Sequence, residues 1–192
     1  MRKLIRLLAA SVAVCIVTPL IPAQLQPGTA STYKEKVLHA FTGGSDGYQP
    51  GMLVRDANGN LYGTATFGAN MSGECGPGYL YDGCGVVFEI NAQGKFSVLH
   101  TFDFSDGAAP KNLVEDSNGD LYGTTIWGGN SACQRTGCGV IFKLTTAGDF
   151  TLLYSFSGGS DGANPNSLIR DTSGNLYGTT STSNTGDGEV SS

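Results

Sequence analysis

The sequence predicts an all-β protein made of β-propeller-type repeats, and three observations support this prediction. Stretches of the pattern Asp-x-x-Gly-x-Leu-Tyr-Gly-Thr contain Leu61, Leu121 and Leu176, which are 60 and 55 residues apart (121 − 61 = 60; 176 − 121 = 55). Glycine accounts for 29 of the 192 residues, which suits many turns between short strands. Outside the first 23 residues, no stretch has the 3.6-residue apolar period of a helix. Self-similarity at such a spacing indicates an array of like units.

Residues 1–23 have the pattern of an export signal. Three basic residues lie within the first six positions, and an uncharged apolar run extends from Leu7 to Ile21. Ala23 offers a small residue for cleavage, with Ala30 as a second candidate. The run is short for a membrane span, and no later run approaches about 18 apolar residues. The sequence therefore predicts a secreted, periplasmic or cell-surface protein with no membrane span after signal removal. A retained anchor is the alternative.

The charge balance argues against two classes of partner. The chain has 11 Lys and Arg against 16 Asp and Glu, a formal net charge of −5. Removal of the three basic residues in the signal leaves 8 against 16, or −8 (11 − 3 = 8; 8 − 16 = −8). An acidic chain with scattered Lys and Arg lacks the basic surface that binds nucleic acid, and it suits an anionic membrane surface poorly.

The repeat domain is expected over residues 36–192, after a flexible lead-in at residues 24–35. It begins with an apolar run of strand length at Val37–Phe41, and related runs occur at Val98–Phe102 and Leu152–Phe156. Each run is followed by a connector that contains Ser-Asp-Gly-x-x-Pro. Because Asp-Gly and Pro are turn residues, we expect this connector to be a turn.

Each unit is predicted to hold four short antiparallel strands. After the connector come a strand such as Met52–Val54, the Asp-x-x-Gly turn and a Leu-Tyr-Gly-Thr strand. A longer loop then leads to Gly-Val-Val-Phe-Glu-Ile or its counterpart, and a tight turn leads into the next apolar run. Complete units are expected at about residues 52–102 and 113–156, with a partial third over residues 167–192. Such units are typical of propeller blades, and a sandwich or an open β-array is the alternative.

The repeated motifs resemble a known family. The series F-x-x-x-S-D-G-x-x-P, D-x-x-G-N-L-Y-G-T-T and G-V-[VI]-F-[EK]-[IL] is similar to the GloVer tandem repeat, found in exported bacterial proteins and predicted to form propellers. The resemblance covers residues 37 to about 180. It implies an exported repeat protein and assigns no activity. Because the series stops inside the third unit, we expect about two and a half blades in an open arc rather than a closed ring.

Four cysteines lie beyond the signal, one pair in the long loop of each complete unit: Cys75, Cys84, Cys133 and Cys138. An even number of cysteines in an exported chain predicts disulfides. Of the three connectivities, the local one closes small loops without crossing between units. A zinc site is the alternative, but spacings of nine and five residues without a nearby histidine do not suit one.

We predict no catalytic residues and no metal ligands. Gly43–Gly47 and Gly158–Gly162 fit the G-x-S-x-G pattern of serine hydrolases, but no helix follows and the pattern repeats, which favours turns. His39 and His100 occupy equivalent positions, where the third unit has Tyr154. A position that accepts imidazole or phenol indicates a strand-surface site rather than a metal ligand.

The Asp-x-x-Gly turns resemble calcium loops only superficially. They lack the alternating oxygen ligands and the distant glutamate of an EF-hand loop. We expect Asp56, Asp116 and Asp171 to cap their own turns by accepting backbone hydrogen bonds. Weak calcium binding stays open as an alternative, and no other cofactor is predicted.

One face of the predicted sheets is a candidate ligand surface. The connectors and the cysteine loops emerge on the same side of each antiparallel unit, and function in such scaffolds lies in the longer loops. The residues expected on this face are Phe67, Tyr79, Tyr81, Trp127, Asp46, Asp106 and Asp161. Their aromatic rings could stack on sugar rings or on a peptide. Packing against the adjacent unit is the alternative.

These observations predict an exported binding or interaction module with a carbohydrate or protein ligand. A glycan-active hydrolase or lyase is one alternative, and it would need a pair of carboxylates outside the repeat, whereas every conspicuous aspartate lies within it. A truncated fragment without a function of its own is another alternative. An open arc also exposes sheet edges, so self-association through unpaired strands is expected.

Overall fold

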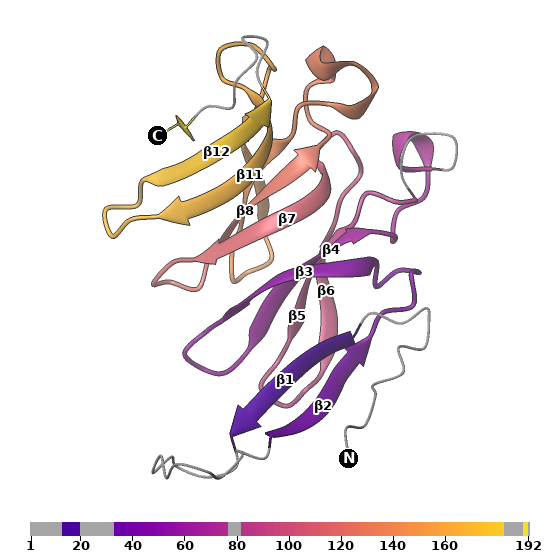
Figure 1. Ribbon diagram of the computed structural model, residues 1–192, viewed down its shortest axis with the longest axis vertical. Coiled ribbons are helices and arrows are strands. Elements are labelled where there is room, and N and C mark those ends of the chain that lie inside the picture. Colours follow the sequence, from indigo (N-terminus) through magenta and orange to yellow (C-terminus); the bar gives the residue numbers. More distant parts are fainter. Residues whose placement is uncertain (1–12, 20–32, 77–81, 183–189, 192) are drawn as a thin grey trace, which may run out of the picture.

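The four-stranded units predicted from the repeats are present in the computed structural model of the chain, which describes residues 13–19, 33–76, 82–182 and 190–191. Two units contain four strands in chain order, a third contains three, and a separate pair of strands precedes them. The units follow one another along an open arc (Figure 1). The all-β prediction and the incomplete propeller are thereby confirmed. Within the described ranges, no helix is long and apolar enough to cross a membrane.

The strands group as follows. Unit 1 consists of β3 (Tyr48–Arg55), β4 (Leu61–Phe67), β5 (Val86–Ile90) and β6 (Phe96–Thr101). Unit 2 consists of β7 (Ala108–Glu115), β8 (Leu121–Trp127), β9 (Val140–Leu144) and β10 (Phe150–Ser155). Unit 3 consists of β11 (Ala163–Arg170), β12 (Leu176–Thr182) and β13 (Val190–Ser191). The N-terminal pair consists of β1 (Ala13–Pro19) and β2 (Tyr33–Ala40). The 3₁₀ helices η1 (Gly73–Cys75) and η2 (Ser131–Thr136) lie in the loops after β4 and β8.

The N-terminal pair has the geometry of the third and fourth strands of a unit. Val14 in β1 lies opposite His39 in β2, as Val87 lies opposite His100 in unit 1, and a register shift follows at the same point in both pairings. β1 falls within the predicted export signal, and β2 begins inside the predicted lead-in. The rest of both segments lies outside the described residues.

The first strand of each unit begins earlier than the sequence predicts. The sequence places Pro50, Pro110 and Pro165 in connecting turns, whereas they lie inside β3, β7 and β11. The residue before each proline has a positive φ of 54°, 56° and 54°, respectively, and the strand register shifts there. Each proline therefore sits at a β-bulge, one of the few strand positions that can lack an N–H donor.

Neighbouring units pack through their first and second strands. β7 packs against β3 and β4, and β11 packs against β7 and β8, which places the first strands next to one another along the arc (Figure 1). The core between units 1 and 2 includes Phe102, Leu113, Leu121 and Phe142, all of them buried. The cores thus lie between the sheets rather than within one of them.

A glycine in the second strand makes room for a phenylalanine of the third strand. Phe88 lies opposite Gly63 in unit 1, and Phe142 lies opposite Gly123 in unit 2. Both phenylalanines have no exposed surface. A Cβ atom on either glycine would collide with the ring. This close approach explains why the repeated motif reads Leu-Tyr-Gly-Thr.

Candidate functional site

Two long loops, after β4 and after β8, are each closed by a disulfide. One bond joins Cys75 to Cys84 and the other joins Cys133 to Cys138, with a Cα–Cα separation of 5.1 Å in each. This is the local pairing that the sequence favours. Cys75, Cys84 and Cys138 are buried.

The second cysteine of each pair also connects neighbouring units. The carbonyl oxygen of Cys84 accepts a hydrogen bond of 3.0 Å from the N–H of Ala109 in β7, and that of Cys138 accepts one of 2.8 Å from Asn164 in β11. Ala109 and Asn164 are the residues with positive φ at the bulges. The strained conformation therefore has a structural purpose, because it directs an N–H group toward the preceding unit.

Three aromatic side chains from units 1 and 2, namely Tyr48, Phe67 and Trp127, form what we call the aromatic row. The ring centroids of Tyr48 and Phe67 are 5.5 Å apart, and those of Phe67 and Trp127 are 6.0 Å apart with ring planes 23° from parallel. All three residues are half-buried, so part of their surface faces solvent. The structure thus brings together Phe67 and Trp127 of the predicted face, while Tyr79 and Tyr81 lie outside the described residues.

Tyr48 is a member of the row that sequence reasoning missed. The sequence places it in a connecting turn, whereas β3 begins at Tyr48 and pairs it directly opposite Phe67. Burial, and then the negative charge of Asp82, raise the pKa of the Tyr48 hydroxyl above its ordinary value. The hydroxyl therefore stays protonated at neutral pH and can donate a hydrogen bond. Strand alternation backward from Pro50 is the signal that could have found it.

The aspartates of the predicted face are bonded within the connectors. Asp46 accepts hydrogen bonds from the backbone N–H of Thr42 at 2.9 Å and from Nε2 of His39 at 3.0 Å. Asp161 accepts one from the Tyr154 hydroxyl at 2.9 Å in the same arrangement. We call this contact, between a fourth-strand ring and the connector aspartate that follows it, the connector latch.

Asp106 forms the third connector latch, with His100 Nε2 at 2.8 Å. Burial alone would raise the pKa of Asp46 and of Asp161, but the hydrogen bonds that both carboxylates accept outweigh it and hold each pKa below its ordinary value. The carboxylates of Asp46 and Asp161 are ionised at neutral pH, and all three connector aspartates are hydrogen-bonded within their latches. We therefore place the candidate ligand site on the aromatic row rather than on the aspartates.

His39 and His100 lie between units rather than on an open strand surface. The His39 ring stacks on Phe96 at 3.7 Å, and the His100 ring stacks on Phe150 at 3.9 Å, both with ring planes 9° apart. Each stack joins the fourth strands of two consecutive sheets. Among the residues that the structure describes, no group of three or more His, Cys, Asp or Glu is placed to hold a metal ion.

The aspartates of the Asp-x-x-Gly turns accept hydrogen bonds from their own turns. Asp56 accepts one from the N–H of Asn60 at 2.7 Å, and Asp171 accepts one from Asn175 at 2.8 Å. Asp116 accepts comparable bonds from Asn118 and Asp120. The turn-capping role expected from the sequence accounts for the repeated aspartate.

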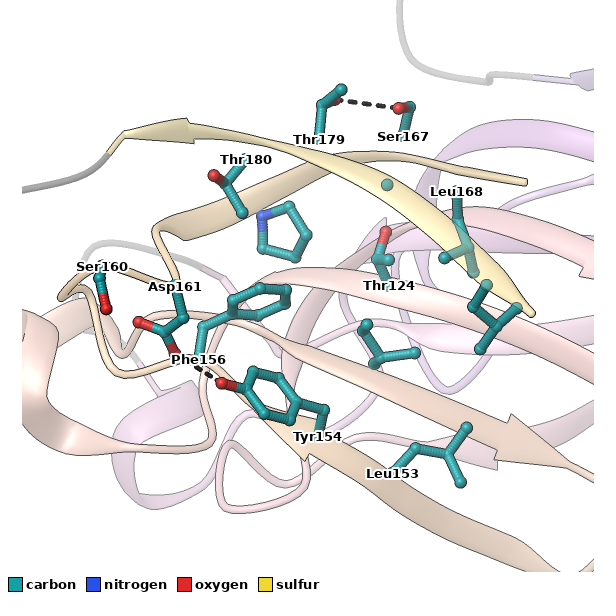
Figure 2. Close-up of a pocket in the computed structure, with 14 residues that line it drawn as sticks. Thr124, Leu153, Tyr154, Phe156, Ser160, Asp161, Ser167, Leu168, Thr179 and Thr180 are labelled. Carbon is teal, nitrogen blue, oxygen red and sulfur yellow. Dashed lines mark hydrogen bonds between the residues drawn. The ribbon is translucent and has the colours of Figure 1, made fainter. Parts of the chain in front are cut away.

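A hollow of about 390 Å³ lies between units 2 and 3, and we call it the unit 3 groove. Leu153, Tyr154 and Phe156 from the end of unit 2 line one side, and Leu168 and Thr180 from unit 3 line the other (Figure 2). The lining is mainly apolar. It lies on the opposite side of unit 2 from the core shared with unit 1.

The chain is similar to known proteins in its repeat family and in its fold. Residues 76–191 match the model of the Gloeobacter/Verrucomicrobia repeat. The solved structure of a luciferin-regenerating enzyme is similar, with a TM-score of 0.53 and 13% sequence identity over 88% of this chain and 50% of that chain. A putative gluconolactonase has a TM-score of 0.45 and 15% identity over 88% of this chain and 55% of that chain. No curated protein matches the sequence.

These structural similarities concern the fold alone. At 13% identity, the likeness to the luciferin-regenerating enzyme agrees with the arrangement of sheets and says nothing about chemistry. The chain spans about half the length of both solved structures.

Proposed function

Because the chain belongs to the Gloeobacter/Verrucomicrobia repeat family, we propose that it is an exported, propeller-type repeat protein that binds a ligand on its loop face. The aromatic row is the observation behind this proposal. Its three rings come from two units and lie near two loops that disulfides hold in shape. A surface that is ordered before binding loses little entropy when a ligand arrives.

Carbohydrate is the ligand class that suits the row best. Flat aromatic faces offer apolar area for the ring faces of a sugar, and a few polar groups beside them would set its orientation. The Tyr48 hydroxyl is such a group, and the charge of Asp82 acts on it. A peptide is the second ligand class that such a surface accommodates.

Export is supported by the disulfides. Disulfide bonds persist in oxidising compartments and are rare in the cytosol. Four of the five cysteines of this chain form two disulfides. Cleavage after Ala23 would remove β1 and leave β2 as the first strand. The protein would then act in the periplasm, at the cell surface or outside the cell.

The proposal is tested by glycan-array binding of the wild type and of Trp127→Ala and Phe67→Ala. We expect wild-type binding to a subset of glycans and its loss in both variants, because each substitution removes one ring face from the row. Tyr62→Ala is the matched control, since Tyr62 lies in β4 with Phe67 but at the other end of the strand. Far-ultraviolet circular dichroism should be unchanged in all variants. Loss of the β-sheet signal together with binding would assign Phe67 and Trp127 a packing role instead.

An enzymatic function has less support. The luciferin-regenerating enzyme carries the name of an enzyme, and the sequence leaves a glycan-active hydrolase or lyase open. Such a reaction needs two carboxylates that face one substrate. Asp46, Asp106 and Asp161 are instead engaged in three separate connector latches, so the repeated aspartates do not supply that pair.

A further inference from the structure

Tyr62 and Tyr122 are equivalent residues of units 1 and 2, and cations lie over only one of them. Tyr122 pairs with Lys143 in β9, whose Nζ atom lies 5.5 Å from the centroid of the tyrosine ring. Arg170, the last residue of β11, lies over the same ring, with its Cζ atom 5.3 Å from the centroid. In the part of the chain that the structure describes, no cation lies over the Tyr62 ring. The Tyr122 ring is therefore a cation–π site that the chain itself fills.

The carboxylates near Tyr122 are balanced by these two cations. Lys143 Nζ lies 2.7 Å from Asp120 Oδ2, and Arg170 Nη2 lies 3.7 Å from Asp116 Oδ2. The side chain of Asp116 is only 3% exposed, so the guanidinium approaches a carboxylate that is largely shielded from water, where the attraction between charges is stronger. Two cations thus match two carboxylates at this junction.

Both cations are replaced by carboxylates at the equivalent positions around Tyr62. Glu89 lies opposite Tyr62 in the third strand, as Lys143 lies opposite its own tyrosine. Glu115 ends the first strand of the next unit, as Arg170 does in unit 3. Neither glutamate forms an ion pair within the described ranges. The junction between units 1 and 2 therefore has the opposite charge at the two positions that supply cations to the next junction.

A third carboxylate, that of Asp56, acts on the same ring. Burial, and then the negative charge of Glu89, raise the pKa of the Tyr62 hydroxyl, and the charges of Asp56 and Glu115 act in the same direction. Burial, and then the charge of Asp56, raise the pKa of Glu115 as well. Three carboxylates thus surround one tyrosine, and none of them has an ion-pair partner among the described residues.

A hollow of about 390 Å³ lies beside Tyr62, between the Asp-x-x-Gly turns of units 1 and 2, and we call it the turn hollow. Asp56, Glu115 and Asp116 contribute carboxylates to its lining, and no lysine or arginine is among the described residues that line it. Tyr62 lies at the opposite end of β4 from Phe67. The turn hollow is therefore separate from the aromatic row.

We propose that the turn hollow binds a guanidinium group, carried by an arginine residue of a peptide or by a small free guanidino compound. The group would lie over the Tyr62 ring, close to the carboxylates of the lining, as the Arg170 guanidinium lies over Tyr122. A guanidinium suits such a site because it stacks on aromatic faces and forms paired hydrogen bonds with carboxylates. The next junction shows that the repeat accepts this group at this position.

The arrangement of the carboxylates favours a guanidinium over a metal ion. Within the described residues, no group of three or more His, Cys, Asp or Glu is placed to hold a metal ion. A guanidinium spreads its charge and its N–H donors over three nitrogen atoms, so it can contact carboxylates that do not converge on one point.

The test is a titration of the full chain with N-acetyl-arginine amide, followed by nuclear magnetic resonance. The amide signals of Asn58 and Asn118, which line the hollow, should shift, whereas that of Phe67 should not. N-acetyl-citrulline amide has nearly the same shape without the charge and should bind at least about ten-fold more weakly, because charge-assisted hydrogen bonds are lost.

A pentapeptide with arginine at its centre distinguishes the two sources of the group. Binding of this peptide at least about ten-fold tighter than that of the amide would assign the hollow to an arginine residue of a polypeptide. Equal binding of the two would assign it to the guanidinium group alone. Both results support the site.

Variants of the chain locate the binding. Glu115→Arg should abolish it, because the new side chain would place a guanidinium of the chain itself over Tyr62. Glu115→Gln should weaken it about ten-fold, since one charged acceptor is lost. Glu74→Gln is the matched control, because Glu74 is exposed and does not line the hollow, and it should bind like the wild type. Far-ultraviolet circular dichroism should be the same for all of these proteins.

Four results would overturn the proposal. The absence of any amide shift up to about 10 mM N-acetyl-arginine amide would exclude a specific site. Equal binding of the arginine and citrulline compounds would show that the charge is not recognised. Binding that both substitutions of Glu115 leave unchanged would place the ligand elsewhere. Shifts of the turn amides with calcium chloride and none with the arginine compound would assign the hollow to a metal ion.

Discussion

The junction between units 1 and 2 and the junction between units 2 and 3 share one framework and differ in what fills it. In both, the first strand of the later unit packs on the earlier unit, and a bulge N–H bonds to a cysteine carbonyl. Leu99 in β6 is half-buried at the first junction, whereas its counterpart Leu153 in β10 is 43% exposed at the second. The first and second strands and the disulfide loops therefore position the next unit, and side chains of the third and fourth strands fill the junction with apolar groups.

The largest effect should come from removing a buried ring at the junction between units 1 and 2. Phe142→Ala removes a fully buried ring and should lower the free energy of unfolding by about 3–5 kcal/mol, because it leaves a cavity between units 1 and 2. Urea unfolding of both proteins measures the difference. Leu152→Ala is the control, because this exposed side chain should contribute within about 0.5 kcal/mol. Equal losses for the two variants would contradict the assignment of Phe142 to the core.

An intermediate effect should distinguish the equivalent glycines. A Cβ atom at Gly123 would collide with the ring of Phe142 and would lie 2.7 Å from the carbonyl oxygen of Asn112. At Gly178 it would meet the carbonyl oxygen of Ser167 at 2.8 Å, with no ring in contact. Gly123→Ala should therefore cost about 1–3 kcal/mol of stability by overpacking, and Gly178→Ala less. Thermal unfolding of the two variants side by side would measure this, and an equal cost would mean that the ring yields without strain.

The smallest effect concerns the connector latches and is pH-dependent. The pKa of Asp46 is below its ordinary value in the folded protein, so its ionised form stabilises the fold. That contribution is present above the unfolded pKa of about 3.9 and is lost as the pH falls through the folded pKa. Asp46→Asn should therefore cost about 0.5–1.5 kcal/mol at pH 7 and progressively less below pH 4.

The same substitution at Asp161 tests the connector latch between units 2 and 3. Its pKa is lowered in the same direction, but its partner Tyr154 is 45% exposed, so Asp161→Asn should cost less than Asp46→Asn at pH 7. Urea unfolding at pH 7, 5 and 3.5 would follow both variants. A loss of stability that grows as the pH falls would show that the ionised carboxylates do not stabilise the fold.

Much of the fold followed from local chemistry. The Asp-x-x-Gly turns and the strands beside them are set by residues a few positions apart, so their repetition predicted an all-β fold of four-stranded antiparallel repeats. The bulges at Pro110 and Pro165 could not be predicted in this way, because their strained residues are stabilised by carbonyl groups of the preceding unit. Ala109 bonds to Cys84, 25 residues earlier (109 − 84 = 25), and Asp-Gly-x-x-Pro alone has the composition of a turn.

The candidate site was predictable only in part for the same reason. Phe67 and Trp127 occupy equivalent positions in the repeat, which placed them on one face, but their mutual contact depends on how two units pack. Tyr48 was missed because the sequence predicted a connecting turn where β3 begins. The equivalence of His39, His100 and Tyr154 was visible in the sequence, whereas their bonds to the connector aspartates became apparent only in three dimensions.

The disulfides have a consequence for proteolysis. A protease that cuts one peptide bond between Cys75 and Cys84 opens the backbone of the loop but does not separate the two pieces, because the sulfur–sulfur bond still joins them. The same holds between Cys133 and Cys138. β4 and β5, and likewise β8 and β9, would stay paired within one covalent molecule after such a cut. The two disulfide-closed loops can therefore be nicked without releasing a fragment.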